Sequence, residues 1–263
     1  MTKHKLFWLP MALVLAAMVG CSGNKEATSE QPAPATSATA EAPPTPIDPS
    51  TVGEITGKIS FQGEKPKPKP IMMDQDPVCV RAHQGKGASF EDGEVNANGT
   101  LPNAFVYVKA GAEKYTFATP TEQAVLDQKG CMYIPHVLGV LVGQDVHIVS
   151  SDPTTHNIHP MPKDNREWNE SQAPGAPPID KTFAREEIMI PVKCNQHNWM
   201  RAYIGVMKNP FFAVSGSDGS FTIKGLPPGD YTIGAWTATF GEQEQKVTVG
   251  PKEKKTVDFA FKS

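Results

Sequence analysis

The sequence predicts an all-β protein with sandwich architecture, and three observations lead to this prediction. The chain has 22 glycines and 25 prolines among its 263 residues, a composition that favours turns. Its apolar and β-branched residues occur in short alternating runs separated by turn residues. No window long enough for a sizeable helix keeps an apolar period of three to four residues. Helix bundles, coiled coils and doubly wound sheets are therefore disfavoured.

The first 20 residues have the pattern of an export signal. Basic residues at positions 3–5 precede an apolar run of roughly 15 residues, which is too short for a membrane span. The run ends in Ala-Met-Val-Gly before Cys21, which resembles a bacterial lipoprotein cleavage box. This resemblance implies that Cys21 becomes the N-terminus and carries a lipid, and ordinary cleavage near Gly20 is the alternative. We expect an exported protein anchored to a bacterial membrane and facing the periplasm, with the outer membrane favoured, or a cell-surface location.

A tether is expected at residues 21–52, which are rich in Pro, Ala, Ser and Thr. Such a segment buries too little apolar surface to offset its ordering entropy, so we expect it to be disordered. The net charge of the chain is −3, which gives no basic footprint for nucleic acid. DNA binding is therefore excluded from the expected functions.

The expected strands begin at residue 53 and continue to the end of the chain. The Lys/Pro-rich segment 64–70 is expected to be a solvated loop. Two strands should flank the turn at 143–145 within residues 136–151. The other strand-bearing segments are 53–61, 104–110, 186–194, 200–208, 211–236, 246–250 and 254–261.

The C-terminal strands carry a recognisable pattern. Residues 219–236 read as a Gly-x-Phe strand, a Leu-Pro-Pro-Gly turn and a Tyr-x-Ile-x-Ala-Trp strand. This stretch resembles the carboxypeptidase regulatory-like domain, a prealbumin-like or Ig-like β-sandwich that carries no chemistry of its own. The opening strand of such a domain fits residues 55–59, so we expect a discontinuous domain at 53–118 and 209–263. A second β domain, 119–208, would be inserted in it; two sandwiches in series are the alternative.

The residues with the clearest chemistry lie in the second domain. A Cys-x2-His-x2-Met run supplies Cys194, His197 and Met200, and His156 follows the strand expected at 146–150. One thiolate, two imidazoles and a weaker thioether are the ligands of a mononuclear blue copper site. A short loop between two strands can deliver three of these ligands to one ion. Zinc sites seldom use methionine, so this ligand set favours copper.

Residues 121–208 resemble a cupredoxin, the family of plastocyanin and amicyanin. The resemblance lies in His-Asn-Ile at 156–158, in the short ligand loop at 194–200, and in Gly-Gln-Asp-Val at 143–146. It implies a Greek-key β-sandwich that holds one copper per chain through His156, Cys194, His197 and Met200. It also implies that Asn157 braces the two ligand loops, with its backbone N–H directed at the thiolate.

Two neighbours and one long segment bear on this site. Trp199 would shield the metal, lie on the electron path, or serve only as core packing. His159 competes with His156, but residues three apart on a strand face opposite sides, so we expect His159 outside the ligand set as a second-layer or surface imidazole. The segment 160–185 is longer than a minimal cupredoxin needs and could cover or reshape the region near copper.

The remaining cysteines suggest a disulfide. If a metal holds Cys194, then Cys79 and Cys131 are left as the expected pair in an oxidising compartment. The alternative is a second metal site that uses Cys79 with His83 and Cys131 with His136.

Three functional hypotheses follow. The leading one is a membrane-tethered, one-electron copper carrier that is not an enzyme, because no catalytic motif is recognisable. Its partner would be a cytochrome, an oxidase or a dehydrogenase. The first alternative is a copper carrier or assembly factor that delivers Cu(I) to an oxidase. The second is a structural β-sandwich module whose cluster holds zinc or no metal.

Overall fold

The computed structural model describes residues 43–262, so the expected export signal, Cys21 and most of the expected tether lie outside the described residues. Within this range the chain is nearly all-β, as predicted, and its helix content is the short α1 (Pro77–Ala82). Between residues 43 and 262, no helix combines the length and the apolar character that a membrane span requires. The strands form two sandwiches, which we call sandwich A and sandwich B.

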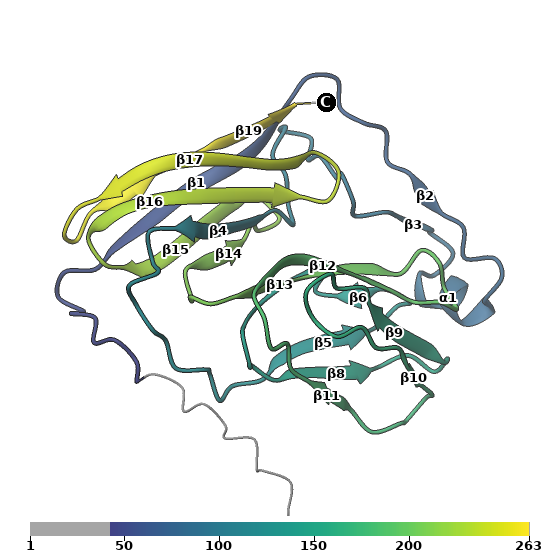
Figure 1. Ribbon diagram of the computed structural model, residues 1–263. Helices are drawn as coiled ribbons and strands as arrows, with labels where there is room; N and C mark the ends of the chain where they lie inside the picture. Colours follow the sequence, from purple (N-terminus) through teal and green to yellow (C-terminus); the bar gives the residue numbers. More distant parts are fainter. Residues whose placement is uncertain (1–42, 263) are drawn as a thin grey trace, which may run out of the picture. The chain divides into compact units, whose positions relative to one another are not determined.

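Sandwich A combines strands from both ends of the described chain. The first strand, β1 (Gly53–Gln62), pairs in parallel with β18 (Lys254–Thr256) and β19 (Phe259–Lys262), and Figure 1 shows the purple β1 beside the yellow β19. One sheet contains β15 (Ser220–Leu226), β1 (Gly53–Gln62), β18 (Lys254–Thr256) and β19 (Phe259–Lys262). The other has the order β14 (Phe212–Val214), β4 (Phe105–Ala110), β16 (Gly229–Thr237) and β17 (Gly241–Val249). Successive side chains on a strand point to opposite faces of the sheet, so every second residue of these strands faces inward. The inward apolar side chains of the two sheets form one buried cluster.

Sandwich B is formed by the strands between β4 and β14. Its larger sheet has the order β10 (Glu170–Gln172), β9 (His156–Pro160), β12 (Glu187–Lys193), β13 (Arg201–Met207) and β7 (Val137–Leu141). Its smaller sheet has the order β11 (Ile179–Lys181), β8 (Val146–Ser150), β5 (Ala124–Gln128) and β6 (Tyr133–Ile134). A second buried cluster fills the space between these sheets.

The two sandwiches meet at a third apolar cluster that includes Phe105 and Met207. Gly139 on β7 and Gly205 on β13 are directly paired in the sheet. A Cβ atom at Gly139 would lie 2.4 Å from the ring of Phe212, and one at Gly205 would lie 2.6 Å from the ring of Phe105. The paired glycines therefore leave the space into which the aromatic rings of sandwich A pack.

A separate segment connects β1 to β4 and crosses to sandwich B. It contains the two-stranded sheet of β2 (Pro70–Ile71) and β3 (Ala88–Ser89), with α1 between them. Ile71, Met73 and Cys79 are buried in the core of sandwich B. The predicted disulfide between Cys79 and Cys131 is present and ties α1 to the turn before β6.

Two segments differ from the sequence-based expectation. Residues 43–52 belong to the expected tether, yet Thr45 donates its backbone N–H to the carbonyl of Thr116 at 2.9 Å, and Ile47 packs against the core of sandwich A. The segment 160–185, expected as a long loop, contains β10 and β11, which pair with β9 and β8. Its strands extend the edges of sandwich B.

Candidate metal centre

The loop between β12 and β13 carries three of the four predicted ligands. Strand β12 ends at Lys193, and β13 begins at Arg201, its antiparallel partner. The loop is closed by its own backbone, because Cys194 N–H donates to Met200 C=O at 3.3 Å and Met200 N–H donates to His197 C=O at 2.9 Å. This compact turn directs Cys194 and His197 to the same side, toward β9.

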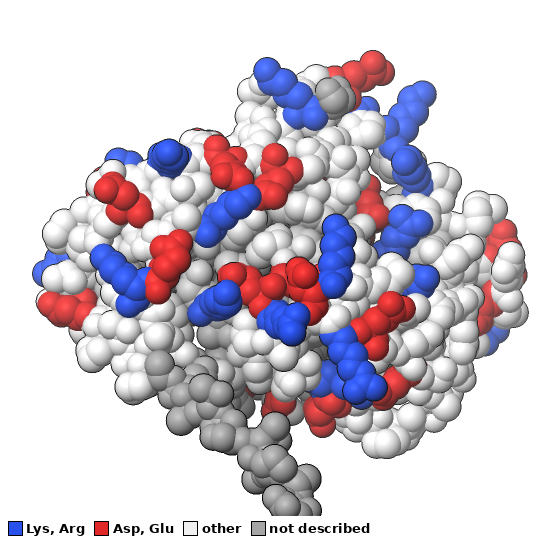
Figure 2. All heavy atoms as spheres, viewed as in Figure 1, with Lys and Arg blue, Asp and Glu red and all other residues white. Residues whose placement is uncertain are grey.

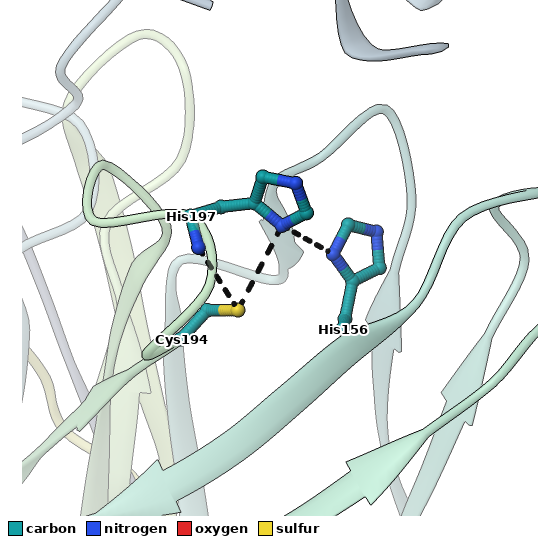
Figure 3. A group of neighbouring side chains, drawn as sticks. All are labelled: His156, Cys194 and His197. Carbon is teal, nitrogen blue, oxygen red and sulfur yellow. Dashed lines mark hydrogen bonds between the residues drawn. The ribbon is translucent and has the colours of Figure 1, made fainter. Parts of the chain in front are cut away.

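His156, the first residue of β9, completes a cluster of three donors. The Nδ1 atoms of His156 and His197 are 2.9 Å apart, and the Sγ atom of Cys194 lies 3.8 Å from Nδ1 of His197. All three donor atoms lie within 4.8 Å of one another, and all three side chains are buried. Figure 3 shows the three side chains pointing toward one another from the loop and the neighbouring strand. Met200 is fully buried in the same apolar cluster as Cys194.

Asn157 connects the two ligand-bearing segments. Its backbone N–H donates to Sγ of Cys194 at 3.5 Å, and its side-chain oxygen accepts the backbone N–H of Asn195 at 2.7 Å. Its own side-chain amide donates to Asn169 at 2.6 Å, and its carbonyl accepts the Tyr133 hydroxyl at 2.6 Å. Asn169 and Tyr133 therefore fix the position of Asn157, and Asn157 in turn fixes the ligand loop at Cys194 and Asn195.

The outer nitrogen of each imidazole faces a carboxylate. Nε2 of His156 lies 2.9 Å from Asp152, and Nε2 of His197 lies 3.0 Å from Asp76. Burial would raise the pKa of both carboxyls, but hydrogen bonds from the histidines and from backbone N–H groups lower the pKa of each. An ionised carboxylate only accepts hydrogen bonds, so each Nε2 carries a proton, and Nδ1 is the ring nitrogen left to bind a metal.

The electrostatics of the cluster suit a metal thiolate. Burial alone would raise the pKa of Cys194, but hydrogen bonds from His156 and from the N–H groups of Asn157 and His197 lower that pKa to about 6. Burial would lower the pKa of His156, but Asp152 and Cys194 raise it to about 9. A bound cation would take the place of the additional proton that His156 holds below this pKa. The donor set fits copper: one thiolate, two imidazoles with carboxylate partners, and a buried methionine nearby.

Trp199 and His159 lie beside this cluster. Trp199 is buried, its ring centroid is 5.0 Å from that of His197, and its Nε1–H donates to the carbonyl of Cys131 at 3.0 Å. It therefore packs over one ligand and also has a hydrogen-bonding role. His159 lies outside the cluster, with its ring nitrogens 2.6 Å from Glu167 and 3.3 Å from Asn195.

The histidines of the alternative second site lie elsewhere. His136 pairs with Asp92 at 3.0 Å, and His83 pairs with the carbonyl of Gly130 at 2.7 Å. Cys79 and Cys131 are bonded to each other in a disulfide, so neither offers a free thiolate. The two cysteines therefore do not form a second metal site with His83 and His136 in this structure.

Neither carboxylate partner could be predicted from the sequence. Asp152 stands four residues before His156, but an acidic residue in a turn after a strand is common and carries no specific signal. Asp76 is 121 residues from His197, so no local pattern links them.

Comparison with known proteins gives one family match and several structural similarities. The family model of the carboxypeptidase regulatory-like domain matches residues 207–262. A search of curated proteins returned no match.

Among solved structures, the chain is similar to three copper proteins or their variants. With a copper-containing nitrite reductase (NirK) from Thermus scotoductus SA-01 it shares 18% identity over 39% of this chain and 25% of that chain, with a TM-score of 0.31. With a purple cupredoxin from Nitrosopumilus maritimus the identity is 19% over 32% of this chain and 99% of that chain, with a TM-score of 0.28. With an oxidised proline-to-glycine mutant of amicyanin the identity is 18% over 39% of this chain and 98% of that chain, with a TM-score of 0.29. The chain thus spans about a quarter of the length of the reductase.

Proposed function

We propose that this chain is a mononuclear copper protein that carries one electron at a time and transforms no substrate. The observation that supports this proposal is the convergence of Nδ1 of His156, Sγ of Cys194 and Nδ1 of His197 within 4.8 Å of one another. Met200, fully buried on the same loop, is the proposed weak axial ligand. Copper would supply the reversible one-electron change between Cu(II) and Cu(I).

The protein's contribution would be to hold these donors in place. Asn157 fixes the sulfur and the ligand loop, and Asp152 and Asp76 fix the ring orientation of the two histidines. Donors that are already held near their bound positions need little rearrangement when the charge on the metal changes. Sandwich A supplies no residue to the cluster, and we assign it a scaffold or docking role.

The burial of the ligands favours an electron carrier over a copper delivery protein. His156 is 0% exposed, Cys194 is 2% exposed and His197 is 6% exposed. A protein that hands its metal to another needs ligands that a recipient can reach, whereas electrons can cross a few ångströms of packed protein. The thioether of Met200 favours copper over zinc.

The proposed export of the chain determines where it would act and which class of partner it would meet. We propose a lipid anchor at Cys21, a periplasmic position, and a redox partner protein such as a cytochrome, an oxidase or a dehydrogenase. On the face shown in Figure 2, Lys and Arg side chains are interspersed with Asp and Glu. This mixture gives no extended basic patch on that face for nucleic acid.

A redox titration in the presence of a Cu(I) chelator tests the proposed function. The full chain, loaded with one Cu(II), would be reduced and reoxidised repeatedly while its visible absorption is recorded. The electron-carrier proposal predicts a reversible one-electron transition with full recovery of the absorption in each cycle. Transfer of the copper to the chelator after the first reduction would instead show a copper delivery protein.

A further inference from the structure

Asp76 uses its two carboxylate oxygens for two different purposes. One oxygen accepts the backbone N–H groups of Val78 and Cys79 at 2.7 and 3.4 Å and so caps α1. The other lies 3.0 Å from Nε2 of His197 and accepts the hydroxyl of Thr154 at 3.1 Å. The start of α1 is therefore connected directly to a proposed copper ligand.

The Cys79–Cys131 disulfide lies next to both histidine–carboxylate pairs. The sulfur of Cys79 lies within 4.8 Å of donor atoms of Asp76 and His197. On the other side of the bond, Cys131 lies within the same distance of donor atoms of Asp152 and His156.

The turn that carries Cys131 also holds the second carboxylate. The N–H groups of Gly130 and Cys131 each donate to Asp152 at 2.7 Å. The carbonyl of Cys131 accepts the indole N–H of Trp199, from the ligand loop itself. One covalent bond thus joins the two segments that hold the outer nitrogens of both histidines.

We propose that segment 71–83 is a cover, locked by the Cys79–Cys131 disulfide, and that Asp76 is the residue through which it positions His197. The inference rests on the proposed function in that His156, Cys194 and His197 are the metal ligands. The cover closes the outer side of the cluster, orients Nδ1 of His197 toward Cys194 and limits the access of solvent, reagents and chelators to the donors. The disulfide keeps this arrangement in place when no metal is bound.

The chain offers closely matched variants for a test. Asp76→Asn keeps an oxygen that can cap α1 but removes the carboxylate acceptor of His197. Asp92→Asn is the control, because it removes the carboxylate partner of another buried histidine, His136, outside the cluster. The double variant Cys79→Ser/Cys131→Ser removes the lock.

The first experiment needs no copper. The metal-free full chain is treated with iodoacetamide, and alkylation of Cys194 is followed over time by peptide mass spectrometry. In the wild type this buried thiol should react slowly. The cover predicts alkylation several-fold faster in Cys79→Ser/Cys131→Ser and in Asp76→Asn, but unchanged in Asp92→Asn. Equal rates in all four proteins, or equal acceleration in Asp92→Asn, would overturn the cover.

The second experiment uses the copper-loaded chain and separates positioning from general stability. Loss of copper to a chelator should be roughly 10–100-fold faster in Asp76→Asn, and the visible band and the reduction potential should shift. Adding Asp76→Asn to the double serine variant should have little further effect, because both changes release the same contact. A slower or unchanged loss of copper in Asp76→Asn, or fully additive effects, would contradict the proposed positioning role. A wild type without any copper band would overturn the proposed function, while the alkylation rates would still decide whether the cover exists.

Discussion

Asn157 contacts the sulfur of Cys194 with both its backbone and its side chain. The backbone N–H donates to Sγ at 3.5 Å, and the side-chain oxygen lies 3.3 Å from the same atom. The two residues are 37 positions apart, Asn157 on β9 and Cys194 directly after the end of β12. This contact fixes the relative position of the two segments that supply the proposed ligands.

Replacement of Asn157 by Ala should destabilise the metal-free protein. The change leaves the backbone N–H of Asn195 without its acceptor in a partly buried position, which costs roughly 1–3 kcal/mol of unfolding free energy. Urea unfolding followed by tryptophan fluorescence measures this loss. Asn195→Ala is the control, because it leaves that backbone hydrogen bond intact. Equal stabilities of the two variants would refute the bracing role of Asn157.

Replacement of Met200 by Leu should leave the thiolate-to-copper band in place and raise the reduction potential. The three strong donors would remain, whereas the weak axial sulfur that stabilises Cu(II) would be lost. Spectroelectrochemistry measures both properties in one sample. Met207→Leu, a buried methionine of the third apolar cluster, serves as the control and should leave the potential unchanged. A band lost in Met200→Leu would show that the methionine has a different role.

Replacement of Gly205 by Ala should weaken the packing of the two sandwiches. The added Cβ would lie 2.6 Å from the ring of Phe105, which is fully buried and has little room to move. Such overpacking costs typically about 1–3 kcal/mol, which thermal or urea unfolding would detect. Gly216→Ala is a suitable control, because its Cβ would meet no atom closer than 3.5 Å. Unchanged stability in Gly205→Ala would mean that the ring contact is not tight.

The buried pair of His136 and Asp92 should make stability depend on pH. Burial would lower the pKa of His136, but the hydrogen bond to Asp92 and the charge of Glu91 outweigh it and raise this pKa. A raised pKa in the folded state stabilises the protein fully below the unfolded value of about 6.5, and this stabilisation is lost as the pH rises through the folded value. The stability difference between wild type and Asp92→Asn should therefore shrink above neutral pH. Urea unfolding at pH 6 and at pH 8.5 measures it, and a difference that grows with pH would contradict the assignment.

The all-β class and most strands could be predicted because alternation of apolar and polar residues is a local signal. The turn at 226–229 and the strand after it follow this pattern, and Tyr231 also donates its hydroxyl to the carbonyl of Pro227 at 2.6 Å. The short strands β10 and β11 could not be predicted, since three residues are too few to show a period. Their pairing depends on the neighbouring strands β9 and β8.

The inner donors of the site could be predicted, but their outer partners could not. Cys194, His197 and Met200 follow one another at intervals of three residues within one loop. His156 is followed directly by Asn157. Asp76 reaches His197 only because α1 is tied to the turn at Cys131 and folds over sandwich B. Such a contact depends on tertiary structure, and no window of the sequence contains it.

Titration of the full chain with Cu(II), followed by visible absorption, tests whether Cys194 binds copper together with His156 and His197. We expect an intense thiolate-to-copper band that saturates at one copper per chain, disappears on reduction with ascorbate and is absent in Cys194→Ser. A colourless protein, or full colour retained by Cys194→Ser, would contradict the assignment of Cys194 with His156 and His197 as the copper site.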